Sequence, residues 1–286
     1  MKKIGMIVND SNSEAIDFGC VLASWVKEDK GEVFVTSSLS SLISPSKVVG
    51  SGGTEEFFDA IDVLIVLGGD GTMLRAVKLV AGLDIPVMGI NLGGLGFLTS
   101  VTVKEAREMT RKVLRGDFSI EQRMMLSVDL ERDGKLFSSH KVLNEAVVKG
   151  LSVRLIRLET SINKEYVTTY RADGLIVATP TGSTAYSLSA SGPILYPTIH
   201  SIIVAPICPF NLMNRPVVIP DWMSVEITVC PEQDNISLVL DGEHDVSIEC
   251  GDVITIKRAE TSVYLIKYEG KSYFDILRER LMWDVK

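Results

Sequence analysis

The chain of 286 residues is short of cysteine, histidine and long hydrophobic runs, and each shortage excludes a class of protein. Its four cysteines, none at C-x-x-C spacing, and its three histidines argue against zinc sites and thioredoxin-type chemistry. A membrane span needs about 20 mainly apolar residues, and the long uncharged segment 174–214 is interrupted by five prolines. The apolar run 4–8 is too short for a signal peptide. We therefore expect a cytoplasmic protein with reduced thiols.

Positive charge is also in deficit, since 37 acidic residues stand against 29 basic ones and the net charge is −8. This balance argues against a dedicated nucleic-acid binder and against a basic membrane-surface protein. A phosphorylated substrate would be repelled by the overall field, so its charge has to be offset locally. The length allows one large domain or two modest ones.

Strand-like and helix-like patterns alternate through the first hundred residues. The apolar runs 63–67 and 85–90 are typical of strands buried on both faces. Ser11 and Glu14 form a capping-box signature before a helical pattern that includes Val21 and Trp25, and a second helical pattern covers 73–80. Residues 36–53 are rich in Ser and Gly and are expected to form a loop. The alternation predicts an α/β domain with a parallel sheet.

From about residue 122 to 267 the pattern changes to short apolar runs separated by turns, which predicts antiparallel, sandwich-like β structure. Asp133 and Gly134 are a hairpin signal, and three further residue pairs are expected to form turns: Asn163 and Lys164, Asp234 and Asn235, Gly251 and Asp252. Residues 273–282 show helical spacing that extends to Trp283, and this helix is expected to pack on the first domain. We predict an α/β domain of residues 1–100 and 271–286 and a β-rich domain of residues 101–270.

The strongest local signal is Gly68-Gly69-Asp70-Gly71-Thr72, directly after the buried run 63–67. Glycines leave the backbone amides open to a ligand, and the N-terminus of the following helix, expected near Thr72, favours an anion such as phosphate. A carboxylate in a phosphate site needs a reason, such as a metal or a hydroxyl proton to remove. The alternative is a plain turn in which Asp70 caps the helix.

A second glycine-rich turn, Asn91-Leu92-Gly93-Gly94-Leu95-Gly96, follows the next strand. It allows a ligand or another backbone to approach closely, although a turn between domains would have the same composition. Its glycines do not fit G-x-G-x-x-G, and the chain has no P-loop, so neither of these nucleotide-binding motifs is present.

Three further motifs carry polar groups in the β-rich half. Asn144 and Glu145 interrupt two apolar runs and could hold a sugar diol, or could lie at an exposed strand end. Residues 179–187 form a turn full of hydroxyls, which could bind a base or sugar, with Tyr186 as a stacking surface. The acidic stretch 241–245 could contribute to a metal site, but an exposed turn is the favoured interpretation.

Together these stretches resemble the NAD kinase family, in order and over nearly the whole chain. The resemblance includes the two glycine turns, the pair Asn144 and Glu145, and Thr179-Pro180-Thr181-Gly182-Ser183-Thr184-Ala185-Tyr186; it continues through Arg215-Pro216, Asp241-Gly242 and the chain's end. It implies transfer of a phosphoryl group from ATP, or from another donor such as polyphosphate, to the 2′-hydroxyl of the adenosine ribose of NAD. It also implies Mg²⁺ or another divalent metal, and a homodimer or homotetramer.

The resemblance assigns roles to individual residues. Asp70 matches the catalytic acid that deprotonates the hydroxyl, Asn144 and Glu145 match residues that hold ribose hydroxyls, and Asp173 matches an acid that reaches a neighbouring subunit's site. The remaining expected NAD- or ATP-binding residues are Gly68, Gly69, Gly71, Thr72, Arg75, Asn91, Gly93, Gly94, Phe97, Arg171, Thr181, Thr184, Ala185, Tyr186 and Ser189.

The chain departs from the family pattern at a few positions. Phe210 replaces a histidine, so the resemblance does not determine whether this chain prefers NAD or NADH as substrate. Glu243 replaces a glutamine. Two other functions compete with an NAD kinase: a lipid or sugar kinase that shares the G-G-D-G-T turn, and a dinucleotide sensor without catalysis. The hydroxyl-rich turn favours a nucleotide over a lipid, and the presence of Asp70 argues against a sensor.

Overall fold

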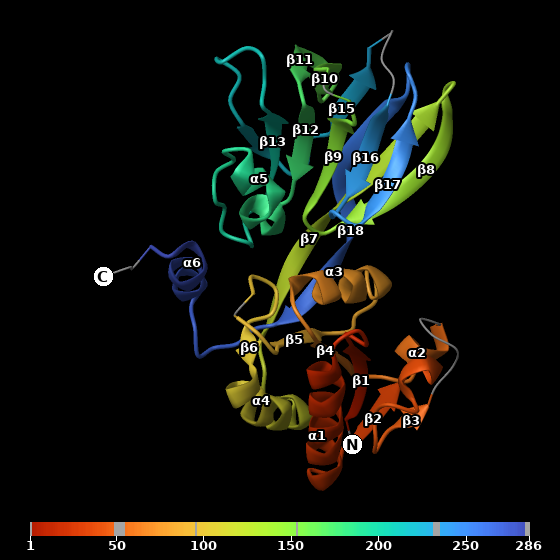
Figure 1. Ribbon diagram of the computed structural model, residues 1–286, viewed down its shortest axis with the longest axis vertical. Helices are drawn as coiled ribbons and strands as arrows, with labels where there is room; N and C mark the ends of the chain where they lie inside the picture. Colours follow the sequence, from red (N-terminus) through yellow and green to blue (C-terminus); the bar gives the residue numbers. More distant parts are fainter. Residues whose placement is uncertain (1, 49–54, 95, 153, 231–234, 284–286) are drawn as a thin grey trace. The chain divides into compact units, whose positions relative to one another are not determined.

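The computed structural model describes residues 2–48, 55–94, 96–152, 154–230 and 235–283 (Figure 1). The chain forms two compact units: unit 1 comprises 1–122 and 263–286, and unit 2 comprises 123–262. Strands β7 (Ile120–Arg132) and β18 (Val253–Ile266) extend across these divisions. Within the described ranges, no helix is both long enough and apolar enough to cross a membrane.

Unit 1 is built on a parallel sheet, as predicted. Its strands pair in parallel in the order β3-β2-β1-β4-β5, and β6 and the end of β18 also pair with β5. All five residues of β4 are buried, which confirms the interpretation of the run 63–67. The bounds are β1 (Lys3–Val8), β2 (Glu32–Val35), β3 (Lys47–Val48), β4 (Val63–Leu67), β5 (Val87–Asn91) and β6 (Val101–Thr102).

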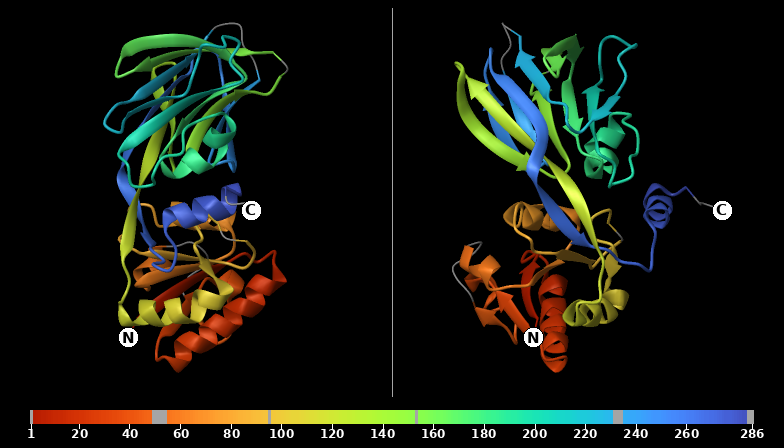
Figure 2. Two further views of the ribbon diagram at one scale, coloured as in Figure 1. Left: turned by 90° about the vertical axis from the view of Figure 1, so that its left-hand side faces the viewer. Right: turned by 180° about the vertical axis from the view of Figure 1, so that it is seen from behind.

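Helices α1 (Ser13–Glu28) and α4 (Val103–Arg115) lie side by side against one face of this sheet (Figures 1 and 2). Their apolar side chains, among them Leu22 and Met109, share one core with Met6 and Ile65 of the strands. The predicted cap of α1 was one residue off: Asn12 is the N-cap, and its side chain accepts a hydrogen bond from the Glu14 amide.

The remaining elements of unit 1 are α2 (Glu55–Asp59), α3 (Asp70–Leu79), α6 (Tyr273–Leu281) and the 3₁₀ turn η1 (Ser37–Leu39). Because η1 and β3 lie within 36–48, the prediction of a loop there was only partly right. Ile276 and Leu277 of α6 are buried as expected, whereas Trp283 lies beyond the end of the helix and is exposed.

Unit 2 is an antiparallel β sandwich, which confirms the predicted class. One sheet has the order β14-β13-β12-β9-β16-β17, and the facing strands are β7, β8, β10, β11, β15 and β18. Both sheets contribute to one core, for example Leu158, Leu175, Leu238 and Ile254. The bounds are β8 (Lys135–Val142), β9 (Glu145–Gly150), β10 (Ile156–Ile162), β11 (Glu165–Ala172), β12 (Gly174–Ala178), β13 (Ser201–Ile207), β14 (Val217–Pro220), β15 (Val225–Val229), β16 (Ile236–Leu240) and β17 (His244–Ile248).

The second face of the β14–β17 sheet carries a smaller apolar cluster. Ile176, Ala178 and Ile203 are its centre, and Ala190 and Leu195 pack against them. These last two residues belong to the uncharged segment, which also forms the 3₁₀ turn η2 (Thr181–Thr184) and the short helix α5 (Tyr186–Ser189). The lack of charge in 174–214 therefore reflects in part its packing against a sheet.

The hairpin turns follow the sequence signals. Asp133 and Gly134 join β7 to β8 with φ of 51° and 69°, and Asn163 and Lys164 join β10 to β11 with φ of 53° and 68°. Two successive residues with positive φ match the right-handed twist of the flanking strands. Asp234 lies outside the described residues.

The two units meet after residues 122 and 262, whereas the predicted domains meet after residues 100 and 270. α4 accounts for the first difference, because Ala106, Met109 and Val113 are part of the core of unit 1. The end of β18 accounts for the second, since Leu265 pairs with Val87 of β5.

Candidate functional site

The G-G-D-G-T turn lies at the carboxyl end of β4, where ligands of parallel α/β sheets bind. α3 begins at Asp70 with Gly69 as its N-cap, two residues earlier than expected. A Cβ built on Gly69 or Gly71 would meet no atom of another described segment within 4 Å, and both residues are exposed. Packing therefore does not require glycine at these two positions, and their backbone is open to a ligand.

The Asp70 carboxylate does not cap its own helix but binds a distant loop. Its Oδ2 accepts a hydrogen bond from the Phe97 amide at 2.9 Å. Its Oδ1 accepts from the Leu98 amide at 3.1 Å, and from the amide and hydroxyl of Thr99 at 3.2 and 3.0 Å. A carboxylate oxygen offers about two lone pairs. Within the described residues Oδ1 is thus saturated, whereas Oδ2 retains a position for one more donor.

The second glycine turn is tied to the same carboxylate. Asn91, at the end of β5, donates to the Thr99 hydroxyl at 2.9 Å and accepts from the Gly93 amide at 2.9 Å. A Cβ on Gly96 would lie only 2.1 Å from Asp70 Oδ1, so glycine is required there for close approach. Gly94 is open and exposed, like Gly69 and Gly71. Leu95 lies outside the described residues.

In unit 2 the structure brings together two motifs that are 35 positions apart, Asn144 and Thr179. The Thr179 amide donates to the Asn144 carbonyl at 2.8 Å, and its hydroxyl donates to the Leu143 carbonyl at 2.6 Å. A Cβ on Gly182 would lie 2.2 Å from the Asn144 carbonyl oxygen, so this glycine allows the two backbones to meet. The start of β9 and the η2 turn therefore form one compact structure.

The hydroxyls of this turn have a different use from the one expected. Thr179, Ser183 and Thr184 donate to backbone carbonyls of Leu143, Pro180 and Thr181. These three hydroxyls therefore hold the turn of residues 179–184 itself. No sequence signal pointed to Arg123, a buried residue of β7 that donates to the Thr181 hydroxyl at 3.3 Å.

Glu145 is an acid of unit 2 whose surroundings shift its pKa strongly. It is only 5% exposed, so the alternative of an exposed strand end is wrong for it. Burial, together with the negative charge of Asp241, raises the pKa of Glu145 from 4.5 to about 8, against the effect of a hydrogen bond from the Tyr186 amide. A buried carboxyl in this state is neutral at pH 7.

Asp241 has a structural role that the sequence did not reveal. The residue is 4% exposed, so the expectation of an exposed turn fails for it. Its carboxylate accepts hydrogen bonds from three successive amides, Leu143 at 3.0 Å, Asn144 at 2.7 Å and Glu145 at 3.1 Å. Asp241 therefore fixes the backbone that presents Asn144 and Glu145.

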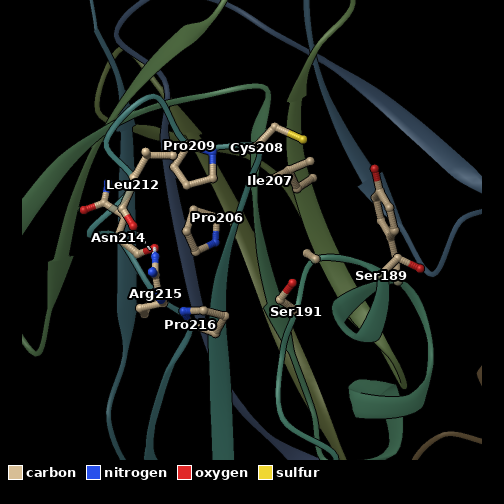
Figure 3. Close-up of a pocket in the computed structure, with 12 residues that line it drawn as sticks. Ser189, Ser191, Pro206, Ile207, Cys208, Pro209, Leu212, Asn214, Arg215 and Pro216 are labelled. Atoms are coloured by element: carbon tan, nitrogen blue, oxygen red, sulfur yellow. Dashed lines mark hydrogen bonds between the residues drawn. The ribbon is translucent and has the colours of Figure 1, made fainter.

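A pocket of about 550 Å³ lies on unit 2, between the α5 segment and the chain that follows β13 (Figure 3). Two expected site residues, Tyr186 and Ser189, line it. Tyr186 is 43% exposed, so its ring is accessible for stacking. The other lining residues lay outside the predicted site: Ala190, Ser191, Pro206, Ile207, Cys208, Pro209, Leu212, Asn214, Arg215 and Pro216.

The structure also shows what Phe210 does in place of the family's histidine. Its ring lies under the guanidinium of Arg171 at 4.6 Å, and its amide donates to the Arg171 carbonyl at 2.8 Å. Arg171 and Asp173 are both exposed at the end of β11 and just after it. Arg75 is exposed on α3, and Thr72 is buried against Gly68.

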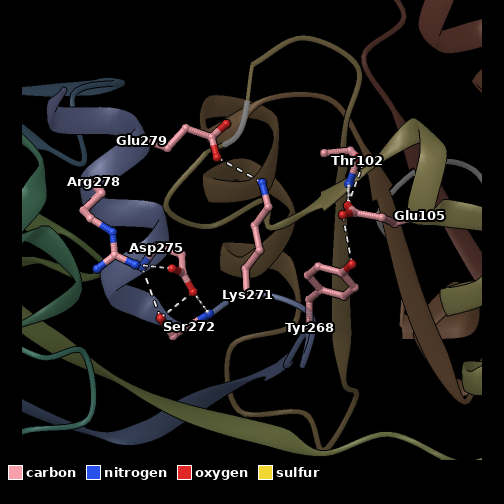
Figure 4. Close-up of polar contacts among 8 residues, drawn as sticks. All are labelled: Thr102, Glu105, Tyr268, Lys271, Ser272, Asp275, Arg278 and Glu279. Carbon is pink, nitrogen blue, oxygen red and sulfur yellow. Dashed lines mark hydrogen bonds and ion pairs between the residues drawn. The ribbon is translucent and has the colours of Figure 1, made fainter. Parts of the chain in front are cut away.

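Polar contacts hold the segment around α6 within unit 1 (Figure 4). The Tyr268 hydroxyl donates to Glu105 at 2.9 Å, and Lys271 pairs with Glu279 at 3.0 Å. α6 then places the Arg280 guanidinium 5.8 Å from the centre of the Phe97 ring, within the range of a cation–π contact. Phe97 thus contacts both α6 and the Asp70 carboxylate.

Comparisons with known proteins agree with the resemblance. Residues 4–118 match the ATP-NAD kinase N-terminal domain, and residues 143–268 match the ATP-NAD kinase C-terminal domain. The chain is 39% identical over 284 residues to an NAD kinase of Geobacter metallireducens, and 38% identical over 283 residues to one of Desulforamulus reducens. The first alignment covers 99% of both chains; the second covers 98% of this chain and 97% of its relative.

Solved structures show the same fold. A yeast NADH kinase complexed with NADH matches with a TM-score of 0.90 and 25% identity, over 100% of this chain and 89% of the other. An NAD kinase from Archaeoglobus fulgidus in complex with ATP matches with a TM-score of 0.71 and 26% identity, over 99% and 97%. These matches decide against a lipid or sugar kinase.

Proposed function

The chain belongs to the NAD kinase family and has NAD kinase activity, and on that premise we propose how its residues perform the transfer. The acceptor is the 2′-hydroxyl of the adenosine ribose of NAD, the donor is ATP or another phosphoryl donor, and the product is NADP. The observation that supports this most is the Asp70 carboxylate, fixed by four donors beside an open glycine turn with one acceptor position left on Oδ2.

Asp70 acts as the general base. Four hydrogen bonds fix the orientation of its carboxylate, so no rotation has to be frozen when the acceptor hydroxyl binds. The remaining position on Oδ2 accepts the hydroxyl proton as the oxygen attacks the transferred phosphoryl group. The bond from that phosphorus to the donor's bridging oxygen breaks, and the rest of the donor, ADP where the donor is ATP, leaves with the bonding electron pair. Positioning of this kind is the main protein contribution to phosphoryl transfer.

The glycine turns bind phosphate through the backbone. Gly69 and Gly71 lie at the start of α3, where the unpaired amides of a helix N-terminus and the helix dipole favour an anion. No side chain of the described residues lies where a Cβ would stand at either glycine. Gly93 and Gly94 form a second open stretch, which Asn91 holds in shape. Amides in place of lysine clusters agree with a chain whose net charge is −8.

Unit 2 binds the dinucleotide. Asn144 and Glu145 engage ribose hydroxyls, on a backbone that Asp241 holds. Tyr186 and Ser189 supply one wall of the pocket, and Thr181, Thr184 and Ala185 support that wall. Phe210 presents an apolar ring where the family has a polar one, so the preference between NAD and NADH is set partly here.

The residues fit a divalent metal carried by the donor's phosphates. Among the described residues, no three His, Cys, Asp or Glu side chains cluster as a metal cage, and Mg²⁺ in nucleotide sites is bound largely by phosphates and water. The open glycine turns leave room for a metal–nucleotide complex. When bound, the metal offsets the negative charge of the phosphates.

The protein is a homodimer or homotetramer. Three large apolar side chains that are close together in the sequence, Phe210, Leu212 and Met213, are 66–82% exposed. A contiguous exposed apolar patch is typical of a surface that another subunit covers. Asp173, exposed after β11, reaches the neighbouring subunit's site. Sedimentation analysis should show a mass of two or four chains, and a monomer at micromolar concentration would contradict the proposal.

The activity is tested by incubating the purified protein with NAD, Mg²⁺ and a donor and measuring NADP with an NADP-specific dehydrogenase. Parallel reactions with ATP, another nucleotide or polyphosphate, each with NAD and with NADH, identify the donor and acceptor. Failure to produce NADP with every donor would contradict the proposed transfer, and NAD binding without any turnover would indicate a sensor.

A further inference from the structure

The Glu145 carboxyl is a buried group with an unused atom. Its Oε2 is inaccessible to solvent and has no hydrogen-bond partner within the described part of the chain. No described lysine or arginine forms an ion pair with it. A buried polar atom without a partner costs free energy, and native proteins keep such atoms mainly where function uses them.

The charged groups around Glu145 do not favour its ionisation. On the turn between β16 and β17, Asp241 is buried and negative, and Glu243 is exposed. On α5, Tyr186 contributes its backbone amide, while its phenol is partly exposed. At the η2 turn, Arg123 brings a positive charge and donates to the Thr181 hydroxyl. Burial and Asp241 raise the pKa of Glu145 to about 8, so the site is protonated at neutral pH.

We propose that Glu145 serves the dinucleotide site as a neutral carboxylic acid, and that ionisation of Glu145 weakens binding of the dinucleotide. The inference rests on the proposed dinucleotide site and specifies its chemistry. An acid supplies one donor and one acceptor, which matches a sugar hydroxyl. An ionised Glu145 would be an acceptor only, beside the Asp241 charge.

The ligand reinforces this preference. NAD carries a negatively charged pyrophosphate. This charge disfavours a second buried negative charge next to Asp241. NAD therefore binds to the protonated site, and above pH 8 binding must be accompanied by uptake of a proton at Glu145. Between pH 7 and pH 9 the dissociation constant for NAD should rise about tenfold.

The test is titration calorimetry of NAD into the full chain at pH 6.5, 7.5 and 9, in pairs of buffers with different ionisation enthalpies. The wild-type protein should take up close to one proton per NAD at pH 9. In Glu145→Gln this uptake and the tenfold change should be lost, because an amide cannot ionise. The control Glu243→Gln removes an exposed acid of the neighbouring turn and should retain both.

Steady-state kinetics separate binding from chemistry. The KM for NAD should rise with pH in the wild type but not in Glu145→Gln, whereas kcat should not show this pH dependence in either protein. Proton release on binding at pH 7.5, or the same pH dependence in Glu145→Gln, would overturn the inference. If the variant fails to fold, the wild-type measurement alone tests the inference, because uptake of protons on NAD binding supports it and release contradicts it. A folded wild type that binds no NAD at any pH would instead contradict the proposed function.

Discussion

The substitution Asp70→Asn tests how the two glycine turns are held together. The new side chain can keep its oxygen at the Oδ1 position, where it still accepts from Leu98 and Thr99, but its amide nitrogen then faces the Phe97 amide. One hydrogen bond to a charged acceptor is lost, at about 1.5–3 kcal/mol. The Phe97 amide should therefore exchange with solvent on the order of 10- to 100-fold faster, and the effect on the Thr99 amide should be smaller.

Hydrogen exchange at single-residue resolution measures this effect, alongside the rate of NADP formation. Asp84→Asn, which changes an exposed acid of the same unit, is the matched control and should alter neither. Unchanged Phe97 exchange with lost turnover would refute the anchoring role. Near-normal turnover would remove Asp70 from the role of base. Fast exchange with lost turnover and intact NAD binding is the expected result.

Three further outcomes are expected. Burial and Asp241 raise the pKa of Glu145 from 4.5 to about 8, so between these values the folded state binds more protons than the unfolded state. The free energy of unfolding therefore falls by about 1.4 kcal/mol for each pH unit as the pH rises through that interval. The melting temperature of Glu145→Gln should exceed that of the wild type by a margin that grows from pH 5 to pH 8. Arg132→Met should lower the free energy of unfolding in urea by about 3–5 kcal/mol, because Asp252, which is 1% exposed, loses its bidentate partner. The control Arg107→Met removes an exposed ion pair and should lower the free energy of unfolding by less than about 1 kcal/mol. Thorough chelation should abolish NADP formation and added Mg²⁺ should restore it; undiminished activity would contradict metal dependence.

Local patterns were enough for much of the fold and for the position of the phosphate turn. The run 63–67 is apolar at every position, and such a strand is stable only when both faces are covered. The glycine turn that follows it has to lie at the carboxyl end of the sheet. Asp133 and Gly134 adopt the positive φ that their residue types tolerate, so the hairpin was also predictable.

The resemblance to a family predicted the site residues, but the sequence did not show how they are held. The residues next to Asp70 suggest that it caps the helix that follows, yet the amides that bind its carboxylate lie 27 to 29 positions away. Asp241 reads as an exposed turn acid, yet it binds amides 96 to 98 positions away. A hydrogen bond between distant segments depends on chain closure, which no local spacing encodes.

The uncharged segment 174–214 shows the same division. The sequence alone determined that this segment contains hydroxyls, small residues and no charge, and that it does not cross a membrane as an apolar helix. Only the tertiary structure decided that the hydroxyls of Thr179, Ser183 and Thr184 hold the turn. It also decided that the neighbouring acid, Glu145, is the group whose protonation the site controls. The physical reason is that burial and a nearby charge set a pKa, and both arise only when distant strands pack together.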